Sequence, residues 1–264
     1  MTATLETCDA TLAYDATVIS QQLSVQVPEH EFTIVIGPNA CGKSTLLKAL
    51  ARLLPPREGT VTLTGRDVRE FGNKEFARAL ALLPQSSQAP DGITVGDLVA
   101  RGRFPHQRFL RQWSIEDEVA VNRAMAATGT TDLVERAVGE LSGGQRQRAW
   151  LAMVLAQDTD VLILDEPTTF LDIAHQIEVL DLCESLHAQG GRTIVAVLHD
   201  LNQAARYGTH LIAMRDGEVV AEGAPAEVVT EKMVAEVFGV RASVIAHPET
   251  GTPLVVPLGL VEHA

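Results

Sequence analysis

The chain has 264 residues, of which 46% are hydrophobic, so it can bury a core and is not a disordered chain. Its formal net charge of −13 argues against the broad basic surface that binds nucleic-acid phosphates, and we expect no nucleic-acid partner. Its three cysteines are far apart and no apolar stretch approaches the ~18 residues that cross a bilayer, which disfavours a disulfide framework, a zinc site and an integral membrane protein.

Three short β-type runs open the chain, and the third leads directly into a glycine-rich loop. They are the segments 10–14, 18–27 and 31–37. After the loop, apolar residues at helical spacing predict a helix over 43–54, which the two prolines that follow should stop. The segment 58–68 is expected to be a strand between turns, and 78–85 a helix end or a strand.

The middle of the chain changes character, because strand patterns give way to amphipathic helices. Three helices are expected there, over 94–103, 116–129 and 143–157. Compact apolar runs then return at 161–167 and 193–200, of the kind that a doubly covered parallel sheet contains. Between them a helix is expected over 175–189, with Gly190 and Gly191 as its C-cap.

These patterns predict an α/β fold with a helical subdomain, in one domain that spans residues 1–264. We expect the core from about 1–87 and 158–240 and the helical insert from about 88–157. The tail, about 241–264, is expected to form a hairpin around a Pro-Glu-Thr-Gly turn.

The loop after the third β-type run matches the phosphate-binding P-loop pattern in full. Glycines let several backbone N–H groups point at an anion, and the following helix adds its positive N-terminal end. Lys43 is expected to reach the β- and γ-phosphates, Ser44 to ligate Mg²⁺ and Thr45 to support the α-phosphate. The alternative, an accidental glycine-rich turn, is disfavoured by the strand before it and the helix after it. The predicted ATP-binding residues of the loop are Gly37, Pro38, Asn39, Ala40, Cys41, Gly42, Lys43, Ser44 and Thr45.

Cys41 lies within this loop, and two interpretations of it differ in reactivity. A thiol at a helix N-terminus can ionise easily and react readily. The alternative, which we prefer, is a small residue that only has to fit. Alkylation of this thiol is expected to block nucleotide binding, and ATP is expected to protect it.

Two carboxylates, Asp165 and Glu166, are expected at the end of a buried strand formed by the apolar run that begins at residue 161. In a P-loop protein the first holds Mg²⁺, usually through water, and the second polarises an attacking water. His199 ends the next apolar run, at an edge where α/β sheets place their ligand sites, and could orient water at the γ-phosphate. The alternatives are an ordinary acidic strand end and a structural histidine. The other histidines show no metal-ligand spacing.

The segment 141–148, "LSGGQRQR", resembles the signature of ATP-binding cassette (ABC) proteins and precedes Asp165 as that family requires. Physically it is a second anion site, with Ser142 as N-cap and two glycines that expose N–H groups. The resemblance implies the ABC-cassette fold of P-loop NTPases: a RecA-like core, an N-terminal antiparallel β subdomain and a helical subdomain insert. It also implies a head-to-tail ATPase dimer, expected to be a homodimer. The residues that would close over the partner's ATP are Leu141, Ser142, Gly143, Gly144 and Gln145.

Further matches to the family cover nearly the whole chain. Tyr14 resembles the aromatic residue that stacks on adenine, although a core tyrosine is the alternative. Gln85 resembles the glutamine that senses Mg²⁺ and the membrane partner, and Asp172 the D-loop residue that crosses the dimer. The resemblance thus implies an ATPase whose catalytic residues are Glu166 as general base, His199 as switch histidine and Gln85. It implies Mg²⁺ ligands at Ser44, Gln85 and Asp165.

Several longer stretches resemble one branch of the family, the ATPases of ferric-siderophore importers. They are 37–54, 89–107, 141–153 and 164–176. The resemblance implies a separate transmembrane permease, an indirect substrate-binding protein and a place at the cytoplasmic face of the cell membrane. The start of the chain lacks a signal-peptide pattern, which agrees with this expectation. Heme or cobalamin importer ATPases, a separate-chain exporter ATPase and a soluble ABC protein remain alternatives.

The stretch from Asp91 to His106 resembles the region where this class receives its permease. Its aromatic and basic residues suit a docking groove, with a solvated basic face as the alternative. They are Arg101, Arg103, Phe104 and His106. One departure from the family is His30, which stands where a turn glycine is usual and is expected to strain that turn slightly.

Overall fold

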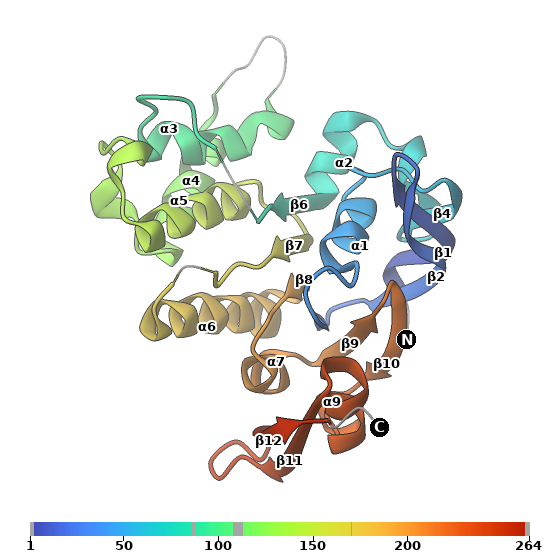
Figure 1. Ribbon diagram of the computed structural model, residues 1–264. Helices are drawn as coiled ribbons and strands as arrows, with labels where there is room; N and C mark the ends of the chain where they lie inside the picture. Colours follow the sequence, from blue (N-terminus) through green and yellow to red (C-terminus); the bar gives the residue numbers. More distant parts are fainter. Residues whose placement is uncertain (1–2, 86–87, 108–112, 170, 262–264) are drawn as a thin grey trace. The chain divides into compact units, whose positions relative to one another are not determined.

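The computed structural model describes residues 3–85, 88–107, 113–169 and 171–261. The chain forms two compact units, one from Met1–Glu70 with Thr193–Ala264 and the other from Phe71–Arg192. In Figure 1 the first unit has blue and orange-red tones, and the second has cyan, green and yellow tones.

An antiparallel sheet of four strands begins the first unit. Its strands are β1 (Ala3–Tyr14), β2 (Thr17–Pro28), β4 (Glu58–Leu63) and β5 (Arg66–Asp67), in the order β2-β1-β4-β5. Along β2, Leu23, Val25 and Val27 are buried while the residues between them are exposed, as a strand with one covered face requires. The single strand expected over 58–68 is two strands, because Thr64 and Gly65 form a turn with positive φ. The predicted N-terminal antiparallel β subdomain is confirmed.

Four further strands of this unit carry its core. They are β3 (Phe32–Ile36), β8 (Thr193–Val197), β9 (His210–Arg215) and β10 (Glu218–Gly223), in the order β10-β9-β3-β8. β3 is parallel to β8 and β9, and every residue of β3 and β8 is buried, as their continuous apolar sequences predict. Because Val35 pairs with Val197, both strands end at the same edge. In the turn before β3, His30 has φ 58°, the left-handed region that favours glycine, as expected.

The helix predicted over 43–54 is α1 (Lys43–Leu50), so its predicted end was wrong. Arg52 has a left-handed backbone, and the N–H groups of Leu53 and Leu54 both donate to the carbonyl of Lys48. This cap closes the helix before the prolines are reached. The remaining helices of the unit are α7 (Leu201–Tyr207), α8 (Pro225–Val228) and α9 (Glu231–Phe238).

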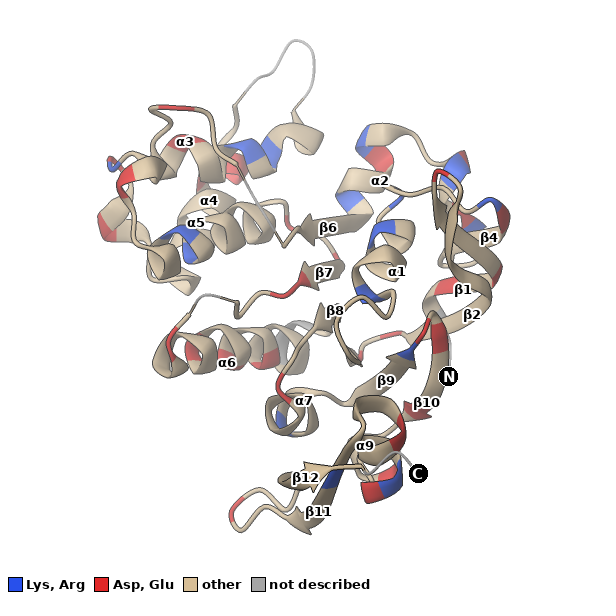
Figure 2. Ribbon diagram, in the orientation of Figure 1, with Lys and Arg blue, Asp and Glu red and all other residues tan. Residues whose placement is uncertain are grey.

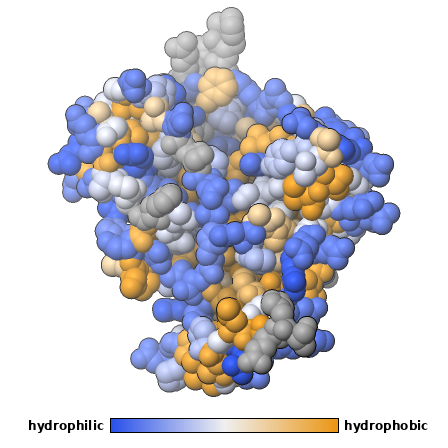
Figure 3. Space-filling model, in the orientation of Figure 1, coloured by the Kyte–Doolittle hydropathy of each residue, from blue (hydrophilic) through white to orange (hydrophobic). Residues whose placement is uncertain are grey.

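The predicted C-terminal hairpin is present as β11 (Val240–Ala246) paired antiparallel with β12 (Pro253–Leu260). Gly251, with φ 71°, supplies the left-handed residue that its turn needs. Apolar side chains stand exposed on this hairpin, which lies at the bottom of Figure 3 among orange atoms. They are Ile245, Val256, Leu258 and Leu260.

The second unit contains one pair of parallel strands and most of the helices. The strands are β6 (Leu80–Leu83) and β7 (Val161–Asp165), which pair in register from Leu80 with Val161 to Leu83 with Leu164. The helices are α2 (Asn73–Ala79), α3 (Val95–Ala100), α4 (Ile115–Ala127), α5 (Gly143–Ala156) and α6 (Ile173–Gly190), with a 3-10 segment at Arg101–His106. The helices predicted in this region are therefore confirmed, and Gly191 is the left-handed C-cap of α6.

Arg103 does not belong to the expected docking groove, because its side chain is buried. Its Nε donates to Asp117 Oδ1 at 2.8 Å, and its Nη1 donates to the carbonyl of Ala156 at 2.8 Å. The guanidinium thus joins the 3-10 segment to α4 and α5, and it presents no charge to a partner. His106 is half-buried with its Nε2 2.8 Å from the carbonyl of Gln157. Of the predicted set, Arg101 and Phe104 are exposed.

Candidate functional site

The P-loop begins at the residue after β3, and its first glycine has no room for a side chain. At Gly37, φ is 153° and a Cβ would lie 2.2 Å from the carbonyl oxygen of Met214. Gly42, with φ 105°, caps the start of α1. The backbone of this loop therefore requires glycine at both positions, which leaves a cradle lined by main-chain atoms.

Lys43 is the buried cation of this cradle. Its ammonium donates to the carbonyls of Gly37, at 2.9 Å, and Pro38, at 2.8 Å, so it folds back over its own loop. Thr45 is buried on α1 and Ser44 is half-buried beside it. α1 carries a second lysine, Lys48, and Figure 2 shows the basic residues of this helix. A positive charge held over exposed backbone at a helix N-terminus is the arrangement that binds phosphate.

Cys41 is buried in the same loop, and burial raises the pKa of its thiol although the nearby Lys43 partly opposes the shift. A buried, protonated thiol is a poor nucleophile. The structure therefore favours the interpretation of Cys41 as a small packing residue.

Tyr14 ends β1 with 40% of its surface exposed, so it is not a core tyrosine. The Nζ of Lys48, from α1, lies 3.3 Å from the Tyr14 hydroxyl and 5.5 Å from the ring centroid. An exposed ring steadied by a cation beside the P-loop helix is a suitable platform for a flat base. Lys48 was not predicted as a site residue, and only its place on α1, five residues beyond Lys43, could have indicated it.

His199 lies exposed two residues beyond β8, and it makes further interactions. Because β3 and β8 are parallel neighbours, His199 and the P-loop follow strand ends at the same edge of this unit. The first unit thus carries the P-loop and His199 after neighbouring strand ends, and Tyr14 in contact with Lys48 of α1.

In the second unit, Asp165 is the last residue of β7 and is buried, and Figure 2 shows acidic residues at this strand end. Glu166 lies outside the strand, with φ 55°, and is half-buried. The expectation that both carboxylates end a strand is therefore wrong for Glu166, which begins the turn after β7. Gln85 is exposed two residues beyond β6, so the parallel pair brings it to the same edge as Asp165.

The signature segment forms the predicted capped helix start. Ser142 Oγ accepts from the N–H of Gln145 at 3.2 Å, and Gln145 Oε1 accepts from the N–H of Ser142 at 3.1 Å. This capping box begins α5, with Leu141 buried and both Ser142 and Gly143 exposed. A Cβ at Gly144 would lie 3.4 Å from Leu171, an ordinary contact, so close packing does not require this glycine.

Asp172 is the N-cap of α6. It accepts from the N–H of His175 at 2.9 Å, and its Oδ1 lies 2.7 Å from His175 Nδ1. These hydrogen bonds, the backbone one above all, lower the pKa of the Asp172 carboxyl. The residue is exposed.

Two contacts near Glu166 were not predicted from the sequence. The Thr169 hydroxyl donates to Glu166 Oε2 at 3.0 Å, and Gln147 Nε2 donates to the carbonyl of Pro167 at 3.1 Å. The spacing of three residues between Glu166 and Thr169, typical of a turn, could have indicated the first. No sequence pattern indicated the second.

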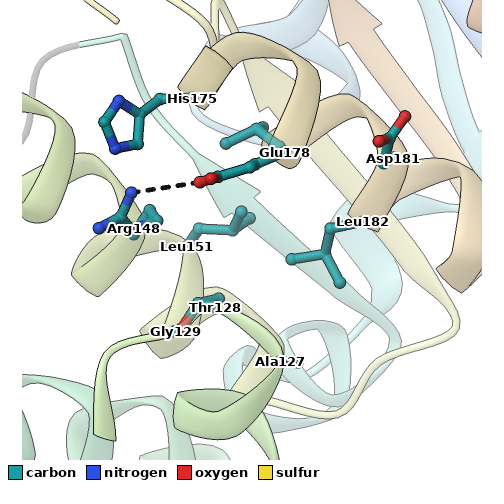
Figure 4. Close-up of a pocket in the computed structure, with 10 residues that line it drawn as sticks. Ala127, Thr128, Gly129, Arg148, Leu151, His175, Glu178, Asp181 and Leu182 are labelled. Atoms are coloured by element: carbon teal, nitrogen blue, oxygen red, sulfur yellow. Dashed lines mark hydrogen bonds and ion pairs between the residues drawn. The ribbon is translucent and has the colours of Figure 1, made fainter. Parts of the chain in front are cut away.

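A pocket of about 580 Å³ also opens on the second unit, between the end of α4, α5 and α6 (Figure 4). Arg148 and Glu178 face each other across it, 3.3 Å apart, with Leu151 and Leu182 nearby. None of the described residues that line it is a predicted site residue.

Comparison with known proteins gives a consistent result. The model of the ABC transporter family matches residues 20–169. The chain is 53% identical to the ferric enterobactin transport ATP-binding protein FepC of Escherichia coli (strain K12), over 94% of this chain and 92% of that protein. It is 54% identical to the probable siderophore transport system ATP-binding protein YusV of Bacillus subtilis (strain 168), over 94% and 90%. Among solved structures, a metal-chelate type ABC transporter in an inward-facing conformation superposes with a TM-score of 0.83 at 26% identity, over 98% of both chains.

Proposed function

Because this chain belongs to the ABC transporter family, we propose that it is the ATP-hydrolysing subunit of an ABC importer for ferric siderophores. The observation that carries the proposal is the P-loop, in which the buried ammonium of Lys43 lies over loop carbonyls between a buried strand and a helix N-terminus. The cargo follows from identity above 50% to two siderophore-transport ATPases over nearly their whole length.

The residues of the P-loop fit a nucleoside triphosphate. Glycine at positions 37 and 42 allows the loop backbone to form the cradle, and Lys43 can exchange its two neutral carbonyl acceptors for charged phosphate oxygens. Thr45 would support the α-phosphate. The adenine would stack on Tyr14, with Pro38, Asn39, Ala40, Cys41 and Gly42 completing the loop.

The residues also fit magnesium, since a serine hydroxyl, an amide oxygen and a buried carboxylate are oxygen donors of the kind Mg²⁺ prefers. Ser44, Gln85 and Asp165 would hold it. When bound, Mg²⁺ neutralises charge on the β- and γ-phosphate oxygens. Among the described residues no three His, Cys, Asp or Glu side chains cluster as a separate metal site.

Glu166 would accept the proton of the attacking water. His199 would contact the γ-phosphate and orient that water. Residues 141–145 would close over the ATP of a second copy with the N–H groups at the start of α5, and Asp172 would contact that copy. Two ATP molecules would thus hold a head-to-tail dimer together, and hydrolysis would release it.

The chain would act with a separate permease at the cytoplasmic face of the membrane, and through it with a substrate-binding protein. In the described part of the chain, no helix has both the length and the apolar character that crossing a bilayer demands. Arg101 and Phe104, which are exposed, are the members of the predicted docking set that could contact the permease.

Two variants test the ATPase. Lys43→Ala should lose ATP binding, because no other side chain of the loop supplies a buried cation, and normal binding by this variant would contradict the P-loop assignment. Glu166→Gln should bind ATP, stop turnover and accumulate as an ATP-bound dimer in size-exclusion chromatography. Normal hydrolysis by Glu166→Gln would show that Glu166 is not the base.

The cargo is tested in cells that depend on one siderophore ATPase for iron. The chain and its own permease should restore uptake of radioactive iron supplied as a ferric siderophore, and the Lys43→Ala chain should not. Uptake of heme or cobalamin instead, with no uptake of ferric siderophore, would assign the subunit to another importer.

A further inference from the structure

The turn after β7 holds Glu166 by its own backbone and by a side chain. The N–H of Thr169 donates to the carbonyl of Glu166 at 3.2 Å, and the hydroxyl of the same threonine donates to Glu166 Oε2 at 3.0 Å. Glu166 itself has a left-handed backbone, with φ 55°. A left-handed backbone costs glutamate free energy, so the two hydrogen bonds from Thr169 help to keep Glu166 in this conformation.

A third contact joins this turn to the signature helix. Gln147 lies on α5, five residues beyond Ser142, and its amide donates to the carbonyl of Pro167 at 3.1 Å. Gln147 and Thr169 are both half-buried, and Pro167 is buried. The residue next to Glu166 is therefore hydrogen-bonded to the helix that Ser142 caps.

We propose that Thr169 and Gln147 are positioning residues for Glu166. The Thr169 hydroxyl fixes the rotation of the carboxylate through Oε2, so that Oε1 keeps a defined direction as the oxygen that accepts the proton of water. Gln147 ties the same turn to the signature helix, so that movement of α5 reaches Glu166 within one chain. This inference rests on the proposed role of Glu166 as the general base.

The chemistry predicts a specific defect. A hydrogen bond to one carboxylate oxygen holds the group in one rotation, so that the other oxygen stays aimed in one direction. Removing the Thr169 hydroxyl should therefore lower kcat while KM for ATP stays nearly unchanged. ATP binding should change little, because neither residue belongs to the P-loop.

The test compares Thr169→Val, which keeps the shape and removes the hydroxyl, with Thr169→Ser, which keeps the hydroxyl. Thr159→Val is the matched control, since Thr159 lies buried just before β7, where its hydroxyl donates to the carbonyl of Val161 at 2.9 Å. We expect kcat about tenfold lower for Thr169→Val, with KM for ATP within about twofold of wild type. Thr169→Ser should restore kcat, and Thr159→Val should lower the melting temperature without lowering kcat.

Gln147→Met removes the amide donor at nearly the same volume, and it should lower kcat with ATP affinity retained. Wild-type kcat in Thr169→Val, with Glu166→Gln inactive, would overturn the role of Thr169 and leave the proposed function intact. Equal loss in Thr169→Val and Thr169→Ser with lower melting temperatures would show a structural role only. Unchanged kcat in Gln147→Met would overturn the link to α5. Activity in Glu166→Gln would instead overturn the proposed base.

Discussion

Replacing Arg103 by Met should destabilise the second unit strongly, because the arginine neutralises a carboxylate in the interior. The Arg103 and Asp117 side chains are each only 7% exposed, and Nε lies 2.8 Å from Oδ1. Asp117 would keep the hydrogen bonds that the backbone N–H and hydroxyl of Ser114 donate to Oδ2, each at 3.1 Å. It would lose its cation, and the carbonyl of Ala156 would lose its hydrogen bond from Nη1.

The expected loss follows from these contacts. Hydrogen bonds to charged groups contribute about 1.5–3 kcal/mol each, and breaking one partner of a buried ion pair costs about 3–5 kcal/mol. We therefore expect Arg103→Met to lower the free energy of unfolding by about 3–5 kcal/mol. Arg123→Met is the control in the same unit, since its pair with Asp158 has side chains 61% and 42% exposed. That control should cost about 0–1 kcal/mol.

Urea unfolding followed by tryptophan fluorescence measures both losses, because the two tryptophans, Trp113 and Trp150, lie in the second unit. The pKa of Asp117 is lowered overall: burial acts to raise it, but the hydrogen bonds from Arg103 and Ser114 outweigh burial. A lowered folded pKa gives stability that is present above the ordinary aspartate range and lost as pH falls through the folded value. The difference between wild type and Arg103→Met should therefore hold near neutral pH and shrink below about pH 4. A loss no larger than that of Arg123→Met would refute the reasoning.

Two further predictions concern the first unit. Tyr14→Ala should weaken ATP binding about fivefold or more through lost stacking, while Tyr14→Phe should bind as wild type in a fluorescent-nucleotide titration. Equal binding by Tyr14→Ala would exclude the tyrosine as an adenine platform. Cys41 should react with iodoacetamide more slowly than the exposed Cys8 when peptides are analysed by mass spectrometry, because it is buried and its pKa is raised. Equal labelling rates would contradict its burial.

The local features of the fold were predictable because their causes are close in sequence. An apolar β-branched run predicted β3, and the glycines that follow it predicted the P-loop. Ser142 and Gly191 were predicted as caps because the capping residue and the turn it serves are neighbours.

The features that the sequence did not predict depend on distant partners. Arg52, left-handed at the end of α1, donates to the carbonyl of Val68, 16 residues away. The burial of Arg103 depends on Asp117 and on a carbonyl of α5, 53 residues away. The expected docking groove was inferred from a resemblance and from the residue types of one local stretch, so Arg103 was assigned to a surface although tertiary contacts place it inside.

At position 166, the residue that would give the most stable backbone differs from the residue that the proposed chemistry needs. A left-handed conformation costs a residue with a Cβ about 1–2 kcal/mol, and glycine would remove most of that penalty. The position that would supply the proton acceptor is therefore also one where glycine would raise the stability of the folded chain. A thermostabilising screen run without an activity requirement would drift toward glycine at this site, and the enzyme it selected would be sturdier and inert.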